Sequence, residues 1–490
     1  MTNHKAGNSM GRGTLYLMIA HVFFLGGSYA IHFGLGRKLG VETYGDYGVI
    51  LALMTTVNLL LTTGFPQGAS KHIAEENANV SSIVRSSRKV QLLLSMLIFA
   101  LYLGLAGPIA NLLNDPGLTT YIRLSALVIP FYALYAMYSD GYLNGLREFG
   151  KQAKTMAVSS VAKVVMVFTF VLLLGLDVEG AILGYLLAAV VGWILGWRYL
   201  GPVAKSSADF EVSKLIRFGV PATLFSAMLV LIMNIDLYAV KAIVAVDAET
   251  SYYTSATTIA KVPYFIFGGL AAALLPSISR ATSANDLKLI ASYINQSMRY
   301  MLLLLIPGVL ILSATSHDLV SLVYGSDFVE AGSPLRILVF GLACLAVFFV
   351  LAHIMMGDGK TNVAFGMASS LVAIDIILNV VLVPRYELMG AAWATTVASL
   401  IGMIVAAVYI LRRFKALVSI RSFIKICLAS IAVYFIALQF SLSPSLLPLI
   451  YVGLFGIYFG LLLLMKEFSK EDVETFKRII PLTRFSEIRE

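Results

Sequence analysis

Long apolar runs, separated by short polar connectors, recur along nearly the whole chain. Each run has about 20 residues, the length that an α-helix needs to cross the hydrocarbon core of a bilayer. The pattern predicts an all-α integral membrane protein with about fourteen transmembrane helices. The predicted spans are 13–36, 45–66, 90–111, 121–144, 155–176, 180–200, 217–242, 252–277, 297–316, 333–356, 363–384, 389–411, 421–440 and 445–466.

The composition agrees with a membrane protein. Of the 490 residues, 59% are hydrophobic and 13% are charged, whereas about 25% of residues in soluble domains are charged. The net charge of +9 would fit a nucleic-acid ligand, but the cations lie in short connectors between apolar runs. Cys344 and Cys427 lie within apolar runs, where cysteines act as small apolar residues. We therefore expect no nucleic-acid partner, no metal site and no cofactor.

The positions of lysine and arginine orient the chain in the membrane. If the N-terminus is cytoplasmic, 28 of these residues fall in cytoplasmic segments and five at outer ends, as the positive-inside rule requires. The sequence therefore predicts a multi-pass protein of the cell membrane with both termini in the cytoplasm. The charged tail, 467–490, is expected on the cytoplasmic side, either as a surface helix or as a solvated segment.

An internal repeat divides the spans into two sets of six. A shift of 210 residues places Ser159 on Ser369, Asp177 on Glu387, and Gly180 on Gly390. Parallel repeats form two lobes with the substrate site near the membrane midplane between them. The predicted parts are an N-lobe (1–200), a cytoplasmic linker (201–216), a C-lobe (217–413), two appended helices (414–466) and the tail.

Polar residues inside the spans are costly in lipid and need a structural or functional reason. In the first span, Thr14, His21, Ser28 and His32 share one helical face. This face is expected either to line a water-filled cavity or to pack against a partner helix.

The seventh and eighth spans hold the other candidates for a transport site. Lys261 and Thr257 share a face directed at the interface between the lobes, and Asn234 lies on a polar face of the preceding span. Lys261 is expected either to bind an anionic cargo or to pair with Asp236. Asp236 is a candidate for binding a coupling ion, with structural pairing as the alternative. In the fifth span, Lys163 follows two serines and is a further candidate for the cavity or for packing within the lobe.

The sequence contains no pattern typical of an enzyme. It has no metal-ligand spacing and no phosphate-binding glycine loop, and the outer loops are too short for a catalytic domain. We therefore predict no catalytic residue. Acidic residues of the outer loops, such as Asp115, are interpreted as solvated turn residues.

Several short motifs carry a resemblance to a known family. They are Arg37–Gly40, Tyr44–Gly48, Asn144–Arg147, Tyr324–Phe328, Pro334–Leu338, Gly357–Lys360 and Gly390–Thr395. In order and spacing, these resemble the polysaccharide transporter, or oligosaccharide flippase, family of the multidrug/oligosaccharidyl-lipid/polysaccharide superfamily. The resemblance covers essentially the whole chain. Glu387–Met389 departs from the family pattern, in which many members carry a glycine, but this segment is an outer turn.

The resemblance implies a flippase that admits a polyprenyl-linked saccharide. The phosphate or pyrophosphate would enter a cationic cavity while the lipid tail stays in the bilayer, and partners would include membrane lipid and the glycosyltransferases and polymerase of the same pathway. A cation-coupled multidrug exporter of the same superfamily is the alternative, and it would require an acidic cavity. A membrane glycosyltransferase or polymerase is a third hypothesis, and it would require a large outer loop with catalytic carboxylates.

Overall fold

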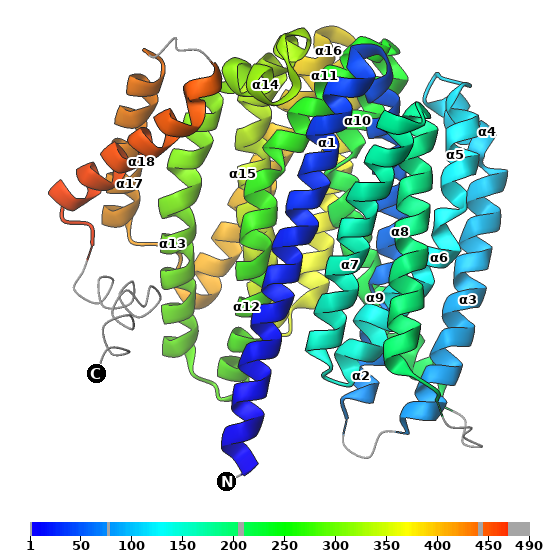
Figure 1. The fold of residues 1–490 in the computed structure, drawn as a ribbon. Helices are drawn as coiled ribbons and strands as arrows, with labels where there is room; N and C mark the ends of the chain where they lie inside the picture. Colours follow the sequence, from blue (N-terminus) through cyan, green and yellow to red (C-terminus); the bar gives the residue numbers. More distant parts are fainter. Residues whose placement is uncertain (1, 76–78, 204–209, 440–443, 469–490) are drawn as a thin grey trace, which may run out of the picture.

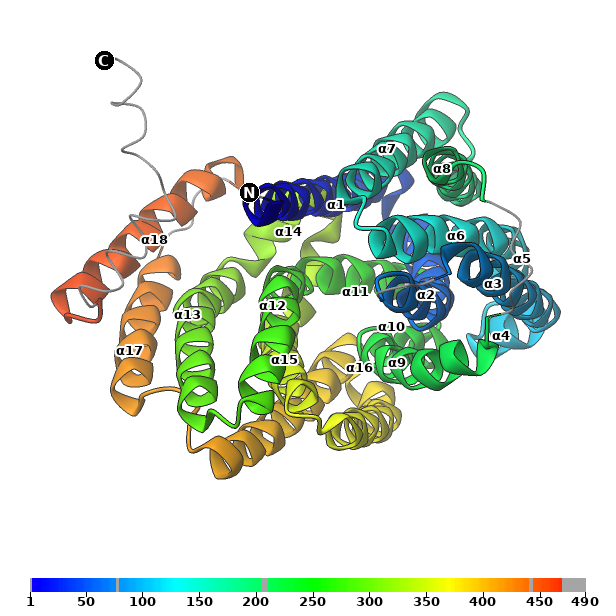
Figure 2. The ribbon, with the colours of Figure 1, turned by 90° about the horizontal axis from the view of Figure 1, so that it is seen from below.

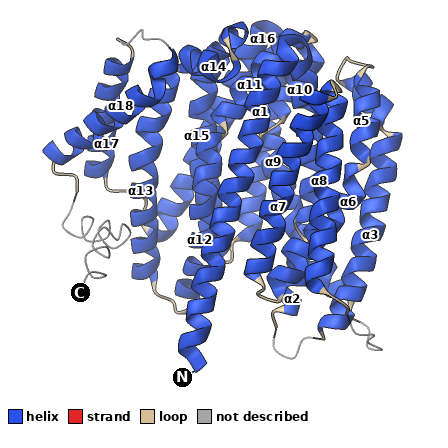
Figure 3. Ribbon diagram, viewed as in Figure 1, coloured by secondary structure: helices blue, strands red, loops and turns tan. Residues whose placement is uncertain are grey.

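The computed structural model describes residues 2–75, 79–203, 210–439 and 444–468, and its side chains from Tyr16 onward except Phe218. In this part of the chain every regular element is a helix (Figure 3). The α-helices are α1 (Thr2–Thr62), α2 (Phe65–Ile73), α3 (Val80–Gly104), α4 (Ala106–Leu112), α5 (Leu118–Ala126), α6 (Val128–Ala136), α7 (Phe149–Phe168), α8 (Asp177–Leu200), α9 (Val212–Ile232), α10 (Ile235–Ala239), α11 (Asp247–Ala260), α12 (Val262–Ser283), α13 (Leu287–Ala314), α14 (Ser316–Tyr324), α15 (Gly332–Gly357), α16 (Thr361–Phe414), α17 (Ile420–Ala437) and α18 (Leu447–Leu464). Short π or 3₁₀ segments are η1 (Met137–Leu143), η2 (Thr169–Leu173), η3 (Val240–Val244), η4 (Ser326–Ala331) and η5 (Pro444–Leu446).

Twelve helical stretches of the described chain are long and apolar enough to cross a membrane, which confirms the all-α membrane class. Two of them, Tyr16–Ile73 and Thr361–Phe414, have 58 and 54 residues, about twice the length of one crossing. Within each, near the middle, lies a residue with a non-helical backbone, Gly40 (φ 72°) in the first and Glu387 (φ 50°) in the second. Both residues lie in predicted connectors between spans. Fourteen crossings stay a prediction that these two kinks support.

The kink at Gly40 gives a reference for naming the two ends of the bundle. Helix α1 rises from its start, turns at Gly40 and returns toward α2 (Figure 1). Glycine adopts the positive φ of such a turn at little cost. We call the end of the bundle at which α1 begins the near end, and the end at which it turns the far end. By the charge pattern, the near end is the predicted cytoplasmic end.

The 210-residue offset of the sequence repeat also relates structural elements. It places the start of α4 at Ala106 on the start of α14 at Ser316. It also places Asp177 (φ 40°) on Glu387 (φ 50°), two non-glycine residues in the left-handed region. These coincidences agree with two copies of one helical unit, and the division into lobes stays a prediction. The linker residues 204–209 and the tail residues 469–490 lie outside the described chain.

The last two helices form an appendage at one edge of the bundle. Viewed from below, α17 and α18 stand beside α13 and apart from α3, α7 and α8 (Figure 2). Together with α13 they bury their own apolar cluster, which includes Leu303, Val433 and Tyr458. The described helices therefore agree with a main bundle and two appended helices.

Several predicted spans of the described chain are interrupted along their length, and 217–242 and 252–277 are two of them. The seventh breaks between α9 and α10, where Asn234 has a non-helical φ of −132° and its side-chain amide donates to the carbonyl of Val230 (3.1 Å). The eighth breaks at Lys261, between α11 and α12. Pro263 lies two residues further on, and proline has no N–H to continue the helical hydrogen bonds.

Candidate functional site

A cavity of about 460 Å³ lies in the middle of the bundle, within the range of small-molecule sites. Its walls come from α1, α6, α7 and α8 of the first half, and from α9 to α12 of the second. Six of the seven residues that the sequence nominated for substrate binding line this one cavity. They are Ser28, His32, Lys163, Asn234, Thr257 and Lys261.

Lys163 supplies the cation on the wall formed by the first half. Its Nζ donates to the hydroxyl of Ser28 at 2.8 Å. The same atom lies 4.5 Å from the ring centroid of Phe24 and 5.3 Å from that of Tyr185, so cation–π attraction adds to the hydrogen bond. Among the described residues, no carboxylate lies within hydrogen-bonding distance of Lys163, so its ammonium is positioned to receive an anionic group from the cavity.

Lys261 supplies the cation on the opposite wall, at the break between α11 and α12. Its Nζ donates to Oδ1 of Asn234 at 3.1 Å, so the residues at the two helix breaks are hydrogen-bonded to each other. The expected alternative, an ion pair between Lys261 and Asp236, is not formed. An amide oxygen carries only a partial charge, and a phosphate would replace it as a stronger partner for the ammonium.

The polar stripe of the first span divides between cavity and surface. Ser28 and His32 line the cavity, whereas His21 is exposed, is not part of the cavity lining, and its Nδ1 contacts the carbonyl of Leu17 at 3.1 Å. Ser28 and His32 lie further from the start of α1 than His21, in the part of the helix that packs against α7. The side chain of Thr14 lies outside the described part. We therefore do not carry His21 into the site.

The rest of the lining is rich in hydroxyl, amide and aromatic groups, and the described lining contains no aspartate or glutamate. The polar and aromatic members that complete it are Phe24, Tyr29, Thr55, Asn58, Thr62, Tyr132, Tyr135, Ser159, Ser160, Tyr185, Thr254, Thr258, Tyr264 and Phe265. The sequence interpretation missed the tyrosines of α6 and α8. Tyr132 and Tyr135, three residues apart on one helical face, were the available signal.

Asp236 lies behind the cavity wall, in a separate buried cluster. Its Oδ2 accepts hydrogen bonds from Tyr253 (2.8 Å) and Thr395 (3.3 Å), and its Oδ1 accepts one from the backbone N–H of Leu237 (2.8 Å). Three hydrogen bonds hold this carboxylate without a cation from the described chain. The expected pairing of Asp236 with Lys261 is therefore replaced by these three hydrogen bonds.

A second carboxylate extends this cluster. Asp375 is fully buried, and its Oδ1 accepts a hydrogen bond from Asn379 at 3.1 Å. Its Oδ2 and the Oδ1 of Asn379 have no partner among the described residues, and the Thr395 hydroxyl is close to this carboxyl as well as to Asp236. Buried acceptors without donors are costly. The cluster therefore has the oxygen chemistry that a proton or a small hard cation would satisfy.

Comparison with known proteins places this arrangement in a wider group. A family model described as polysaccharide biosynthesis protein matches residues 10–282, and a second, MatE, matches residues 221–381. The probable low-salt glycan biosynthesis flippase Agl15 of Haloferax volcanii is 22% identical over 408 residues, which cover 82% of this chain and 83% of the relative. The lipid II flippase MurJ of Bacillus subtilis is 24% identical over 458 residues, which cover 82% of each protein.

Solved structures share the fold. A structure of the lipid II flippase MurJ in an inward closed conformation has a TM-score of 0.72 at 16% identity, and covers 91% of this chain and 98% of that one. An inward-facing multidrug transporter of the MATE family has a TM-score of 0.68 at 16% identity, and covers 82% of this chain and 98% of that one. At these identities the likeness shows a common arrangement of helices.

Proposed function

Since this chain belongs to the polysaccharide biosynthesis protein family, a transporter and flippase family of the multidrug/oligosaccharidyl-lipid/polysaccharide superfamily, we propose that it flips a lipid-linked oligosaccharide across the cytoplasmic membrane. The cargo is an oligosaccharide on a polyprenyl phosphate or pyrophosphate, destined for polysaccharide or glycoconjugate synthesis. Membrane lipid and the glycosyltransferases and polymerase of the same pathway are the proposed partners.

The observation that carries the proposal is the sign of the charge in the cavity. Lys163 and Lys261 approach it from opposite walls, and no carboxylate of the described chain lines it. A cavity for organic cations would need acidic groups, because an uncompensated like charge in a poorly solvated site repels the ligand. The two ammonium groups would attract the phosphate of a lipid-linked sugar and repel a multidrug cation.

The remaining lining supports a sugar as the group beside the phosphate. Asn58, the serine and threonine hydroxyls, and the tyrosine rings offer both hydrogen bonds and flat apolar faces. A sugar presents hydroxyls around its edge and C–H groups on its faces, so both kinds of surface are matched. Specificity then comes from the polar groups, which a ligand lacking the hydroxyls would leave unpaired.

The proposed mechanism is alternating access between two lobes, 1–200 and 217–413. The cavity is built from both, so movement of one lobe against the other exposes the two cations to one membrane face and then to the other. Asp236, together with Asp375, is the proposed site of a coupling ion, since it is buried next to the break in the seventh span. In this proposal both chain termini lie in the cytoplasm, and the charge pattern supports that orientation.

The test is transport by the purified protein in proteoliposomes. A fluorescent polyprenyl-pyrophosphate saccharide is expected to become accessible to a membrane-impermeant quencher from the opposite leaflet, at a rate above that of protein-free vesicles. Ethidium, an organic cation, is expected to show no protein-dependent uptake. Uptake of ethidium without movement of the sugar lipid would favour the multidrug exporter and contradict the proposal.

The matched variants separate charge in the cavity from charge elsewhere. Lys163→Met and Lys261→Met remove the two cavity cations, and Lys38→Met removes an exposed lysine at the far end of the bundle. Transport is expected to fall in the first two variants and to stay at the parent rate in the third. An equal rate in all three would remove the anion-binding argument.

A further inference from the structure

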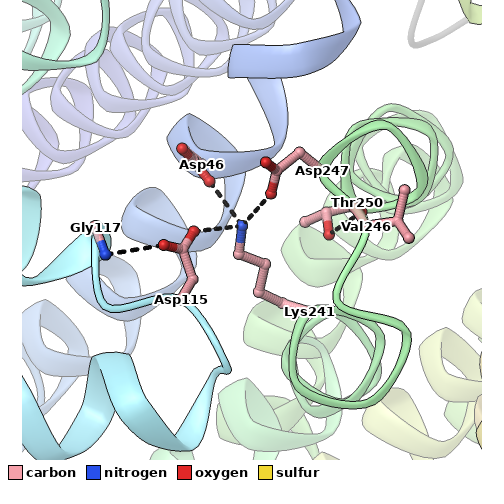
Figure 4. Close-up of polar contacts among 7 residues, drawn as sticks. All are labelled: Asp46, Asp115, Gly117, Lys241, Val246, Asp247 and Thr250. Atoms are coloured by element: carbon pink, nitrogen blue, oxygen red, sulfur yellow. Dashed lines mark hydrogen bonds and ion pairs between the residues drawn. The ribbon is translucent and has the colours of Figure 1, made fainter.

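A cluster of four charged residues joins the two halves of the molecule at the far end (Figure 4). The Nζ of Lys241 lies 2.9 Å from Asp46, 2.7 Å from Asp115 and 2.6 Å from Asp247. The lysine side chain is 2% exposed, although Asp115 was expected to be a solvated turn residue. One ammonium therefore occupies the space between three carboxylates.

The partners of Lys241 come from both halves of the chain. Asp46 lies on the returning part of α1, and Asp115 lies in the turn between α4 and α5, where its Oδ1 also accepts the N–H of Gly117 (3.0 Å). Lys241 itself lies in η3, and Asp247 begins α11. The contact with Asp247 is thus local, whereas the contacts with Asp46 and Asp115 cross between the halves.

These ion pairs are part of a wider closure at the same end. The side-chain amide of Asn114 donates to the carbonyl of Ala242 (2.7 Å), and Nε of Arg37 donates to that of Val323 (2.9 Å). Beneath them lies a layer of buried aromatic side chains, in which the hydroxyl of Tyr44 meets that of Tyr324 at 3.1 Å. The ion pairs, these two hydrogen bonds and the aromatic layer all lie between the cavity and the far end.

Glycines allow the helices to approach closely here. A Cβ on Gly45 would lie 2.9 Å from the carbonyl oxygen of Asp247, and one on Gly48 would lie 2.3 Å from the side chain of Thr254. Gly48 and Thr254 also line the cavity. The contact of α1 with α11 thus closes the cavity on the side that faces the four charged residues.

We propose that Lys241, Asp46, Asp115 and Asp247 form an ionic latch that holds the far end closed and releases it during transport. This inference rests on the alternating-access transporter proposed above and names the contact that must break in each cycle.

The arrangement suits a contact that opens reversibly. If the halves separate, Lys241 keeps Asp247 as its partner, because both belong to the same half. Asp46 and Asp115 are already 20% and 25% exposed, so water can solvate them as the lysine withdraws. No charge is left both buried and unpaired, which is the situation that makes breaking a buried ion pair costly.

The test measures access to the cavity from the far end. In a background with Cys344→Ala and Cys427→Ala, a cysteine is placed at Ala52, which lines the cavity. Intact cells are treated with a membrane-impermeant maleimide. Asp46→Asn and Asp115→Asn are each expected to raise the labelling rate about fivefold or more, as a loss of roughly one cross-half ion pair would do.

The pattern among the variants decides the result. Asp247→Asn removes the partner that Lys241 keeps after the halves separate, so this variant is expected not to raise labelling, and Lys38→Met is the far-end control. Parent-like labelling in both Asp46→Asn and Asp115→Asn would overturn the proposal, and so would an equal rise in Asp247→Asn. The carboxamide variants keep size and shape, so folding is protected better than by replacing the buried lysine.

A second experiment keeps the latch closed with a chemical cross-link and measures transport. In the same background without native cysteines, cysteines at positions 46 and 247, one in each half, are joined by a short bis-methanethiosulfonate reagent. The cross-link is expected to stop transport, and a reducing agent is expected to restore it. Transport that continues after cross-linking would overturn the proposal. Because labelling requires no cargo, the latch can be correct even if the lipid-linked sugar proves not to be the substrate.

Discussion

The replacement Gly48→Ala is expected to separate the two halves at the far end. A Cβ at this position would lie 2.3 Å from Oγ1 and Cγ2 of Thr254, and 2.8 Å from its Cβ. Ordinary van der Waals contact begins near 3.4 Å, so the shortfall is about 1.1 Å. Rotating the threonine side chain cannot remove the clash, because the Cβ of Thr254 stays in place. The helices themselves must move.

The size of the effect follows from comparing two opposing terms. Overpacking of a well-packed contact costs about 1–3 kcal/mol, whereas alanine favours a helix over glycine by about 1 kcal/mol. The second term acts equally in the closed and open states, since α1 is helical at Gly48 in either. Only the first changes their ratio, which is expected to shift toward the open state about 5- to 150-fold.

The assay is the distance between spin labels attached to cysteines at Arg123 and Val329, both exposed, one in each half. Gly48→Ala is expected to shift the distance distribution toward longer values. The control is Gly26→Ala, in the same helix, where a Cβ would meet nothing within 4 Å. The double variant Gly48→Ala/Thr254→Gly removes the threonine side chain that the new Cβ would meet, so it is expected to restore the parent distribution. A Gly48→Ala distribution that superimposes on the parent would refute the reasoning.

Three further predictions concern the cavity, the buried carboxylates and the topology. Lys261→Met is expected to lower sugar-lipid flipping about 10- to 100-fold, because a charge-assisted hydrogen bond contributes about 1.5–3 kcal/mol; Lys261→Arg should retain most activity in the same vesicle assay. Asp236→Asn is expected to remove the response of transport to an imposed Na⁺ or proton gradient while binding of the sugar lipid, measured by fluorescence, persists. Cysteines near the N-terminus and in 201–216 are expected to be labelled from the same, cytoplasmic, face; labelling from opposite faces would contradict the two-lobe arrangement.

The all-α membrane class could be predicted from the sequence, because a bilayer requires every crossing helix to have a certain length and to be apolar. It also placed the turns at Gly40 and Glu387 within predicted connectors. It could not show the breaks at Asn234 and Lys261, since a window of apolar residues is equally long with or without a local break. Pro263 was the only local signal, and proline is tolerated within membrane helices.

The cavity was predicted better than the partners within it. Ser28, His32 and Lys163 were found because polar residues stand out among apolar ones. Periodicity gives the face of a helix but not its depth, so His21 shared the stripe without reaching the cavity. Partners such as Asp46 and Lys241 are 195 residues apart in the chain, and a single sequence contains nothing that pairs them.

The hydrogen bond between Asn234 and Lys261 has a mechanical consequence. An uninterrupted helix moves as one rigid body. The seventh and eighth spans are each interrupted at a residue of this hydrogen bond, so their two segments can change their relative angle. Their segments beyond the joint are pinned at the surface by Lys241 and Asp247, so the segments below can swing without pulling on them. If the proposed anionic cargo takes Lys261 from Asn234, we expect both interruptions to become more flexible at the same time.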